Sequence, residues 1–301
     1  MRNKFVLVGI ITLFCCANGL AQLNLPRESQ RTEIAQVIGD TRVSLVYHRP
    51  NVKAREVWGC QTTDVIPKGG VTYPCLVPNG QVWRLGANEN TTFETNHDLK
   101  INGQTLPAGK YGLHAIPNKD EWIIIFNKVN NEWGSYKYDA KQDQLRVTAK
   151  PVKAEFQETM WLGFENIKAK TADVAVRWEN LRVPFTIDVV GLNDRTLTEI
   201  RKQMSNLKAD DFRIPTQAAN WIYSQKMTAN YAEAIGWLDA SLKAKETPNA
   251  LGLKAYLLAD TGKKAEAIAA AERAIQLAKA MTPAGNTVDL EKRLAEWKGR
   301  K

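Results

Sequence analysis

The sequence is poor in the residues from which metal sites and catalytic centres are usually built. It contains three histidines and four cysteines, and their spacing does not match that of a zinc site. The short motifs of serine hydrolases, zinc proteases and nucleotide-binding loops are also missing. We therefore expect no metal ion and no cofactor, and a protein that binds rather than one that catalyses.

A long apolar segment occurs once, at the start of the chain. Phe5–Cys16 is almost entirely apolar, Arg2 and Lys4 precede it, and the small residues Gly19 and Ala21 follow. This order is typical of a secretory signal peptide. The run is too short to span a bilayer, which needs about 20 apolar residues. We expect residues 1–21 to be removed by cleavage near Ala21, and the mature protein to be periplasmic or secreted and not an integral membrane protein.

Positive charge is not gathered into blocks. The formal net charge is +9, but lysines and arginines alternate with aspartates and glutamates along the chain. This pattern is typical of a solvated surface, whereas a nucleic-acid-binding surface needs a continuous basic stripe. We therefore expect no nucleic-acid partner.

Cys60 and Cys75 remain once the leader is removed. In an oxidising compartment such a pair favours a disulfide. The residues between them include two glycines and two prolines and show no hydrophobic period, so they are predicted to form a loop. Closing a loop of this length stabilises a fold by about 3 kcal/mol.

From about Thr32 to Val190 the hydrophobic period is the two residues of a β-strand. The clearest hairpin is Leu99–Leu106, because Asn102-Gly103 is the dipeptide that a type I′ turn prefers. The other predicted strands are Thr41–His48, Val82–Ala87, Thr91–Asn96, Lys110–Ile116, Glu121–Lys128, Gln144–Lys150, Trp161–Ile167, Ala172–Trp178 and Val183–Val190. Many short strands without intervening helices predict an all-β sandwich or jelly roll for residues 22–191.

After Gly191 the hydrophobic period changes to 3.6 residues. The sequence Tyr-Ala-Glu-Ala-Ile at 231–235 recurs as Lys-Ala-Glu-Ala-Ile at 264–268, 33 positions later. This spacing, with small residues where helices must approach closely, resembles a tetratricopeptide repeat. Flanking helices are predicted at Thr196–Leu207 and Thr287–Trp297. We expect residues 192–301 to form an α-helical array that binds an unknown protein.

The stretch from Val82 to Thr92 is dense in side chains that either bind a ligand or hold a turn. Arg84 offers a planar fork for a carboxylate, and Asn88 and Glu89 offer acceptors close to it. The candidate ligand-binding residues are His48, Arg49, Trp83, Arg84, Asn88, Glu89 and His114. The alternative is a purely structural network in which Arg84 pairs with Glu89 or Asp64.

The same stretch carries a family resemblance. Val82-Trp-Arg-Leu-Gly-Ala-Asn-Glu-Asn-Thr-Thr92 occurs in order with Tyr47-His-Arg-Pro50, Leu106-Pro-Ala-Gly109, Trp133-Gly134 and Tyr138-Asp139. Together these motifs resemble the exported bacterial family named domain of unknown function 2911, from about Arg27 to Val190. The resemblance implies a β fold and export, and it implies no activity. The Cys60–Cys75 segment departs from the family pattern as an insertion.

Two functions are compatible with these residues. In the first, which we favour, a non-enzymatic exported protein binds a glycan or a peptide through its β domain and another protein through its helices. In the second, the chain is an enzyme of unknown reaction, metal-dependent and loosely similar to a cupin, with its site near Trp83–Thr92. Glu89 or His114 would then act as general base, and Arg84 or Arg49 would stabilise an anion.

Overall fold

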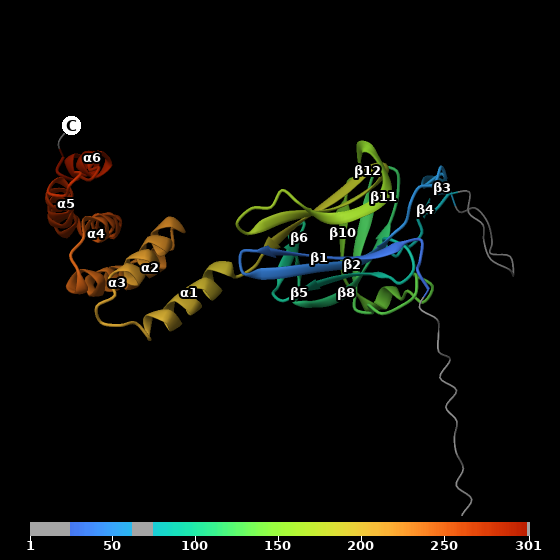
Figure 1. The fold of residues 1–301 in the computed structure, drawn as a ribbon, viewed down its shortest axis with the longest axis horizontal. Helices are drawn as coiled ribbons and strands as arrows, with labels where there is room; N and C mark the ends of the chain where they lie inside the picture. Colours follow the sequence, from blue (N-terminus) through green and yellow to red (C-terminus); the bar gives the residue numbers. More distant parts are fainter. Residues whose placement is uncertain (1–24, 62–74, 300–301) are drawn as a thin grey trace, which may run out of the picture.

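The computed structural model describes residues 25–61 and 75–299. The expected leader, residues 1–21, and most of the loop expected between the two cysteines lie outside this part. Within it, three β-sheets come first in the chain and six α-helices follow (Figure 1). None of the helices in these two ranges has the length and apolar content that crossing a membrane requires.

Two large sheets and one small strand pair make up the β region. The six-stranded antiparallel sheet contains, in spatial order, β1 (Gln30–Ile38), β2 (Thr41–Arg49), β5 (Thr91–Thr95), β8 (Gly109–Ile116), β9 (Trp122–Asn127) and β10 (Asp143–Ala149). The four-stranded antiparallel sheet contains β11 (Val152–Glu165), β12 (Thr171–Val189), β6 (Leu99–Ile101) and β7 (Gln104–Leu106). The small pair, β3 (Trp58–Gln61) and β4 (Val77–Asn79), is parallel.

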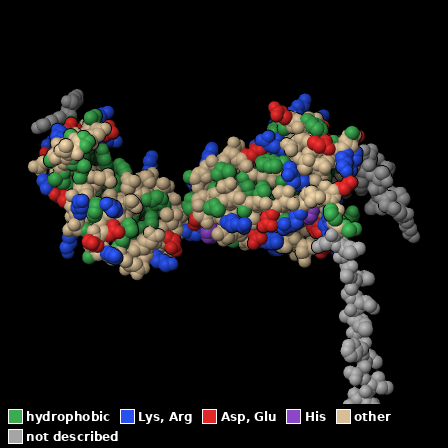
Figure 2. All heavy atoms as spheres, in the orientation of Figure 1, with side chains coloured by type: hydrophobic (Ala, Val, Ile, Leu, Met, Phe, Trp, Pro, Cys, Tyr) green, Lys and Arg blue, Asp and Glu red, His purple; other side chains and the backbone are tan. Residues whose placement is uncertain are grey.

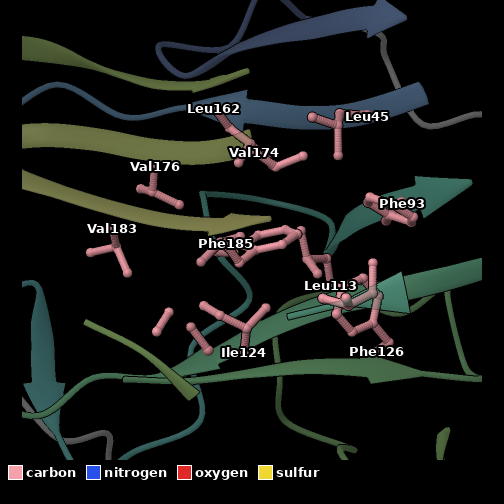
Figure 3. Packing of buried hydrophobic residues seen from close by; sticks show 14 of the residues in the cluster. Leu45, Phe93, Leu113, Ile124, Phe126, Leu162, Val174, Val176, Val183 and Phe185 are labelled. Carbon is pink, nitrogen blue, oxygen red and sulfur yellow. The ribbon is translucent and has the colours of Figure 1, made fainter. Parts of the chain in front are cut away.

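The main hydrophobic core lies between the two large sheets (Figure 3). The two-residue period of β2 places Val43, Leu45 and Tyr47 in this core. From the other sheet, Phe185 of β12 meets Phe126 of β9 edge to face, with ring centroids 5.9 Å apart. Each fully buried side chain of this kind contributes about 1.5–3 kcal/mol. The core therefore provides the rigid frame from which the loops of the site extend.

Two predicted strands form one continuous strand. β12 runs from Thr171 to Val189, whereas the sequence pattern predicts a break between Trp178 and Val183. Glu179 has a φ of 53° and lies at an irregularity in the pairing with β11. A bulge at this point accommodates the polar residues without ending the strand, and the prediction of a break is wrong for that reason.

Residues 82–87 do not form the predicted strand. Trp83 pairs with Ala115 only through an isolated bridge. Leu85 and Asn88 have φ values of 54° and 57°, and a strand cannot continue through this left-handed conformation. The segment is therefore a loop leading into β5, and Arg84 lies on that loop.

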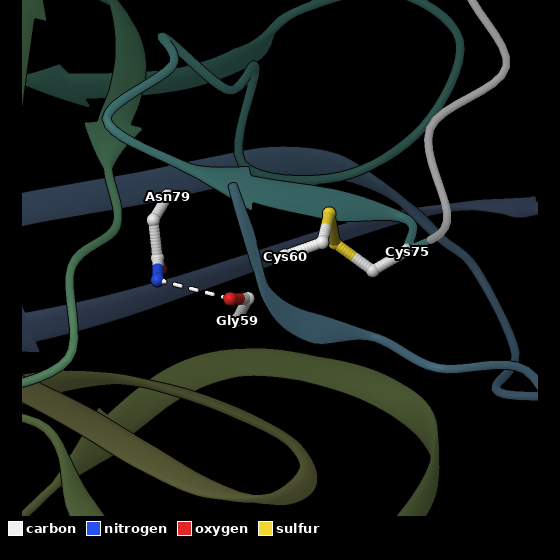
Figure 4. Close-up of a disulfide and its surroundings, with 4 residues drawn as sticks. All are labelled: Gly59, Cys60, Cys75 and Asn79. Atoms are coloured by element: carbon white, nitrogen blue, oxygen red, sulfur yellow. Dashed lines mark hydrogen bonds between the residues drawn. A yellow bond between two sulfur atoms is a disulfide. The ribbon is translucent and has the colours of Figure 1, made fainter. Parts of the chain in front are cut away.

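Two local predictions are confirmed. Asn102-Gly103 adopts positive φ values, 45° and 85°, between β6 and β7. Cys60 and Cys75 form a disulfide with an S–S distance of 2.02 Å (Figure 4). Next to it, the side-chain amide of Asn79 donates to the carbonyl of Gly59 at 3.4 Å. The disulfide thus connects β3 with the residues that lead into β4.

The helical region consists of two packed helix pairs and two flanking helices. The pairs are α2 (Arg213–Ser224) with α3 (Tyr231–Ala244), and α4 (Pro248–Asp260) with α5 (Lys264–Lys279). The flanking helices are α1 (Leu192–Met204) and α6 (Val288–Trp297). Ala234 and Ala267 occupy equivalent positions of the sequence repeat and are fully buried. Their small side chains allow the helices of each pair to approach closely.

Helix α1 is bonded to both regions of the chain. Arg195 forms an ion pair with Asp40 in the β1–β2 turn, with Nε 2.6 Å from Oδ2, and donates to the carbonyl of Val190 at 2.6 Å. Further along the helix, Arg201 pairs with Glu233 of α3 at 2.7 Å. Basic and acidic side chains are interspersed over both regions on the face shown in Figure 2, in keeping with their alternation in the sequence.

Candidate functional site

The candidate residues surround two hollows that share one wall. The first, which we name the Trp83–Arg84 cavity, has a volume of about 460 Å³, and its lining includes Arg55, Trp83, Arg84, Ser135, Tyr136 and Trp178. The second, named the His48–Glu89 cleft, has a volume of about 630 Å³, and its lining includes Arg27, His48, Glu89, Asn90 and Lys110. Ser29 lines both. The segment that precedes β1 therefore separates the two hollows.

Four tryptophans from different parts of the chain form a cluster, of which Trp83 and Trp178 line the Trp83–Arg84 cavity. They are Trp58, Trp83, Trp122 and Trp178, with ring centroids between 5.1 Å and 6.2 Å apart in five pairs. The indole N–H of Trp83 donates to the carbonyl of Gly86 at 3.1 Å, and that of Trp178 to the carbonyl of Glu158 at 3.2 Å. The buried Nε1 of Trp58 has no hydrogen-bond partner within residues 25–61 and 75–299. The cluster therefore contains one buried N–H donor, that of Trp58, without an acceptor among the described residues.

Arg84 lines this cavity and has no counter-ion within residues 25–61 and 75–299. Among the described residues no carboxylate forms an ion pair with it, and its buried Nε has no hydrogen-bond partner. The predicted pair with Glu89 is wrong, because Glu89 accepts hydrogen bonds from Arg27 at 2.7 Å and 2.8 Å. The other predicted partner, Asp64, lies outside the described residues.

Two glycines determine the shape of the loops around Arg84. A Cβ at Gly86 would lie 2.8 Å from the carbonyl oxygen of His48, so this loop rests directly on β2. A Cβ at Gly134 would lie 2.8 Å from Nη1 of Arg84. Gly134 also has a φ of 68°, a conformation that favours glycine. Both positions therefore need glycine for Arg84 to keep its place.

In the second hollow, Nε2 of His48 lies 3.4 Å from Oε2 of Glu89. The hydrogen bond from Arg27 holds the pKa of Glu89 below its ordinary value. Burial lowers the pKa of His48, although the charge of Glu89 acts in the opposite direction. At neutral pH, Glu89 is therefore ionised and His48 is uncharged.

Asn88 and Arg49 hold the backbone and line neither hollow. The side-chain amide of Asn88 donates to the carbonyl of Ser29 at 3.2 Å, which fixes the segment between the two hollows. Nε of Arg49 donates to the carbonyl of Met160 in β11 at 2.8 Å. The structure thus places these two predicted site residues in supporting positions.

His114 lies behind the wall of the Trp83–Arg84 cavity. It is 4% exposed, and its Nδ1 lies 3.3 Å from Oγ of Ser135, which does line the cavity. The ring meets Tyr138 at a centroid distance of 5.4 Å. Burial lowers the pKa of His114 to about 4, so the imidazole is uncharged at neutral pH. It supports the cavity through Ser135.

The three histidines have separate surroundings in the structure. His97 lies beside Asp40, with Nδ1 3.8 Å from Oδ1, whereas His48 lies beside Glu89 and His114 beside Ser135. Within residues 25–61 and 75–299, no three His, Cys, Asp or Glu side chains are grouped so as to hold a metal ion.

Sequence reasoning missed several residues of the Trp83–Arg84 cavity, among them Arg55, Ser135 and Tyr136. These three lie in loops, where no hydrophobic period marks them. Arg55 is oriented by the carbonyls of Asn51 and Val52, at 2.7 Å and 3.0 Å. The family motif Trp133-Gly134 is adjacent to Ser135 and Tyr136, and it was the one feature of the sequence that pointed toward them.

The model of a family described as a protein of unknown function (DUF2911) matches residues 29–187. The match covers just over half of the chain, contains most of the residues around both hollows, and ends before α1. No curated protein and no solved structure matches the chain. The family match agrees with the motifs that surround Arg84, and the chain belongs to the DUF2911 family.

Proposed function

We propose that this protein is an exported, non-enzymatic binding protein whose β region holds a ligand in the Trp83–Arg84 cavity. The disulfide and the apolar start of the sequence support export, because disulfides persist in oxidising compartments. The two packed sheets support a β-sandwich of the jelly-roll type. In such folds, ligands commonly bind at the loops that a rigid frame positions.

The observation that carries the proposal is that Arg84 has no ion pair with any described residue of the chain. A cation held in a partly buried wall is costly unless an acceptor accompanies it. The carboxylate nearest in sequence, Glu89, is bonded to Arg27 instead. Nε of Arg84, which lines the cavity, is a buried donor without a partner in the described part of the chain. A ligand with acceptor atoms would complete this site.

The enzyme alternative has less support from these contacts. Glu89 is a weak proton acceptor, since the hydrogen bond from Arg27 lowers its pKa. His114 is buried behind Ser135, and Arg49 is bonded to a backbone carbonyl. Both groups expected to act as base are therefore occupied or buried, and of the two expected anion stabilisers Arg49 is occupied, whereas Arg84 has no ion pair within residues 25–61 and 75–299.

A binding screen with a matched pair of variants tests the proposal. Tryptophan emission of the mature protein would be followed during titration with a panel of neutral and acidic oligosaccharides, short peptides and aromatic acids. We expect at least one member to change the emission, Arg84→Met to abolish the change, and Arg182→Met to retain it. Arg182 is the control because it is paired with Glu165 at 2.7 Å in the four-stranded sheet.

The same variants separate a binding role from a structural one. Arg84→Met should change the free energy of unfolding by less than about 0.5 kcal/mol, because no folded-state pair is lost. Arg182→Met should lower it by about 1–2 kcal/mol, since Glu165 loses a charged hydrogen bond. If the panel leaves the emission unchanged, or if Arg84→Met is as destabilising as Arg182→Met, the proposal is wrong.

For the helical region we propose a tetratricopeptide-like array that binds a protein. Helices α2, α4 and α6 contribute to a hollow of about 380 Å³ whose lining includes Tyr223, Tyr256 and Leu290. The rings of Tyr223 and Tyr256 stack at 5.9 Å. Aromatic and aliphatic side chains in such a hollow are typical anchors for a partner protein.

A further inference from the structure

We infer that the ligand of the Trp83–Arg84 cavity is a small ring compound that carries a carboxylate. The inference rests on the proposed function and specifies its ligand. It follows from three properties of the cavity wall: its charge, its backbone and its aromatic surfaces.

The charge of the wall favours an anion. The charged residues among those that line the cavity are Glu28, Arg55 and Arg84. Glu28 is already paired with Lys53 at 2.9 Å. Arg55 donates to two backbone carbonyls, and Arg84 has no ion pair within the described residues. In the described part of the chain the guanidinium of Arg84 therefore has no carboxylate partner, and its planar fork matches a carboxylate in a bidentate pair.

The backbone of the wall disfavours an extended peptide. A peptide that adds to a sheet needs free N–H and C=O groups along a strand edge. Pro50 and Pro78 have no N–H. The N–H and C=O of Trp83 are both bonded to Ala115, at 2.7 Å and 2.9 Å, and the N–H of Val77 is bonded to a carbonyl at 2.9 Å. Recognition at this wall must therefore depend on side chains.

The aromatic surfaces of the wall favour a flat ring. Trp83 lines the cavity and is partly exposed, and its ring is stacked against the buried Trp178 with an interplanar angle of 18°. Tyr136 also lines the cavity and is 82% exposed. A sugar ring or an aromatic ring can stack on Trp83 or on Tyr136 while its carboxylate meets Arg84. A volume of about 460 Å³ falls within the range of small-molecule sites, roughly 300–1,000 Å³.

Two sources offer this chemistry, namely uronic acids and aromatic acids, and calorimetric titration of the mature protein distinguishes them. The probes are digalacturonic acid and its neutral dimethyl ester, phenylacetate and its neutral methyl ester, and trialanine. We expect one of the two ring acids to bind and the methyl ester of that acid to bind at least about tenfold more weakly, because a charged hydrogen bond to Arg84 is lost. If the ligand is a uronic acid, phenylacetate will bind weakly. If it is an aromatic acid, digalacturonic acid will bind weakly.

Two variants test the role of Arg84 in this recognition. Arg84→Lys keeps the charge but loses the planar fork, so it should weaken binding of the ring acid by about tenfold. Arg182→Lys should leave that affinity unchanged. Binding should also weaken as salt is raised, because salt screens a partly exposed ion pair.

The inference is overturned if neither acid binds, if acid and ester bind equally, or if trialanine binds more tightly than both acids. A neutral ligand from the fluorescence panel that still depends on Arg84 would overturn this inference and leave the proposed function standing. The proposed function itself is wrong only if no member of the fluorescence panel changes the emission, or if Arg84→Met is as destabilising as Arg182→Met.

Discussion

At the scale of single residues, the hydrogen bonds of Glu89 decide what the site can do. The sequence places Arg84 and Glu89 close together and suggests that they pair. In the structure, Arg27, 62 positions earlier in the chain, takes the carboxylate instead. No local pattern could predict this contact, because it depends on where the segment before β1 crosses the sheet. The consequence is that Arg84 has no ion pair among the residues that the structure describes, and the proposed function depends on this.

The buried His114 gives a prediction about acid stability. Its folded-state pKa is about 4, below the ordinary value of 6.5. Above pH 6.5 the imidazole is uncharged in both the folded and the unfolded chain. Below pH 6.5 the unfolded chain binds the proton first, so the free energy of unfolding falls until the pH reaches about 4.

Between pH 7 and pH 4.5 the free energy of unfolding of the wild-type protein should fall by about 2–3 kcal/mol more than that of His114→Gln, which lacks the imidazole. Urea unfolding at the two pH values measures the difference. Ser135→Ala is the matched control, because it removes the hydrogen bond to His114 but keeps the imidazole, and it should follow the wild-type pH dependence. Equal losses in wild type and His114→Gln would contradict the prediction.

At the scale of elements, predictions based on hydrophobic period succeeded where the period is regular. The Asn102-Gly103 hairpin and most strands lie where the sequence pattern placed them. The prediction failed at residues 82–87, where left-handed backbone replaces the strand. It also failed in β12, where a bulge at Glu179 continues a strand that appeared to end. Both failures occur where local backbone conformation overrides the side-chain pattern, and the first of them forms the candidate site.

The disulfide connects β3 with the residues that lead into β4, and both strands are short. β3 and β4 have four and three residues, and Cys60–Cys75 closes a loop with a sequence separation of 15. Replacing both cysteines by serine should lower the free energy of unfolding by about 3 kcal/mol. Urea unfolding with and without reductant checks this, because reductant should destabilise the wild type and leave the double variant unchanged. Identical midpoints for wild type and variant would refute it.

At the scale of the whole molecule, the two regions are joined through α1. Arg195 bonds Asp40 of the β1–β2 turn, and Arg201 bonds Glu233 of α3. Gly39 leaves room for Leu192 at the start of the helix, since a Cβ there would lie 2.7 Å from that side chain. The sequence predicts two regions of different architecture, but it does not predict this joint, because its partners lie 155 positions apart.

From the contacts of Arg195 we predict how the two regions move relative to each other. Arg195→Ala removes both hydrogen bonds to Asp40 and the one to Val190, so the helical region should sample a wider range of positions relative to the sheets. Small-angle X-ray scattering should then show a larger radius of gyration and a broader distance distribution. The melting temperature should change little, because partly exposed ion pairs contribute about 0–1 kcal/mol.

Arg201→Ala is the control, because it removes the α1–α3 contact and leaves the connection of α1 to the sheets intact. In this variant, limited proteolysis should cut the 189–192 junction as slowly as it does in the wild type. Arg195→Ala should expose that junction, and unchanged scattering together with unchanged proteolysis would show that Asp40 does not hold the two regions in place.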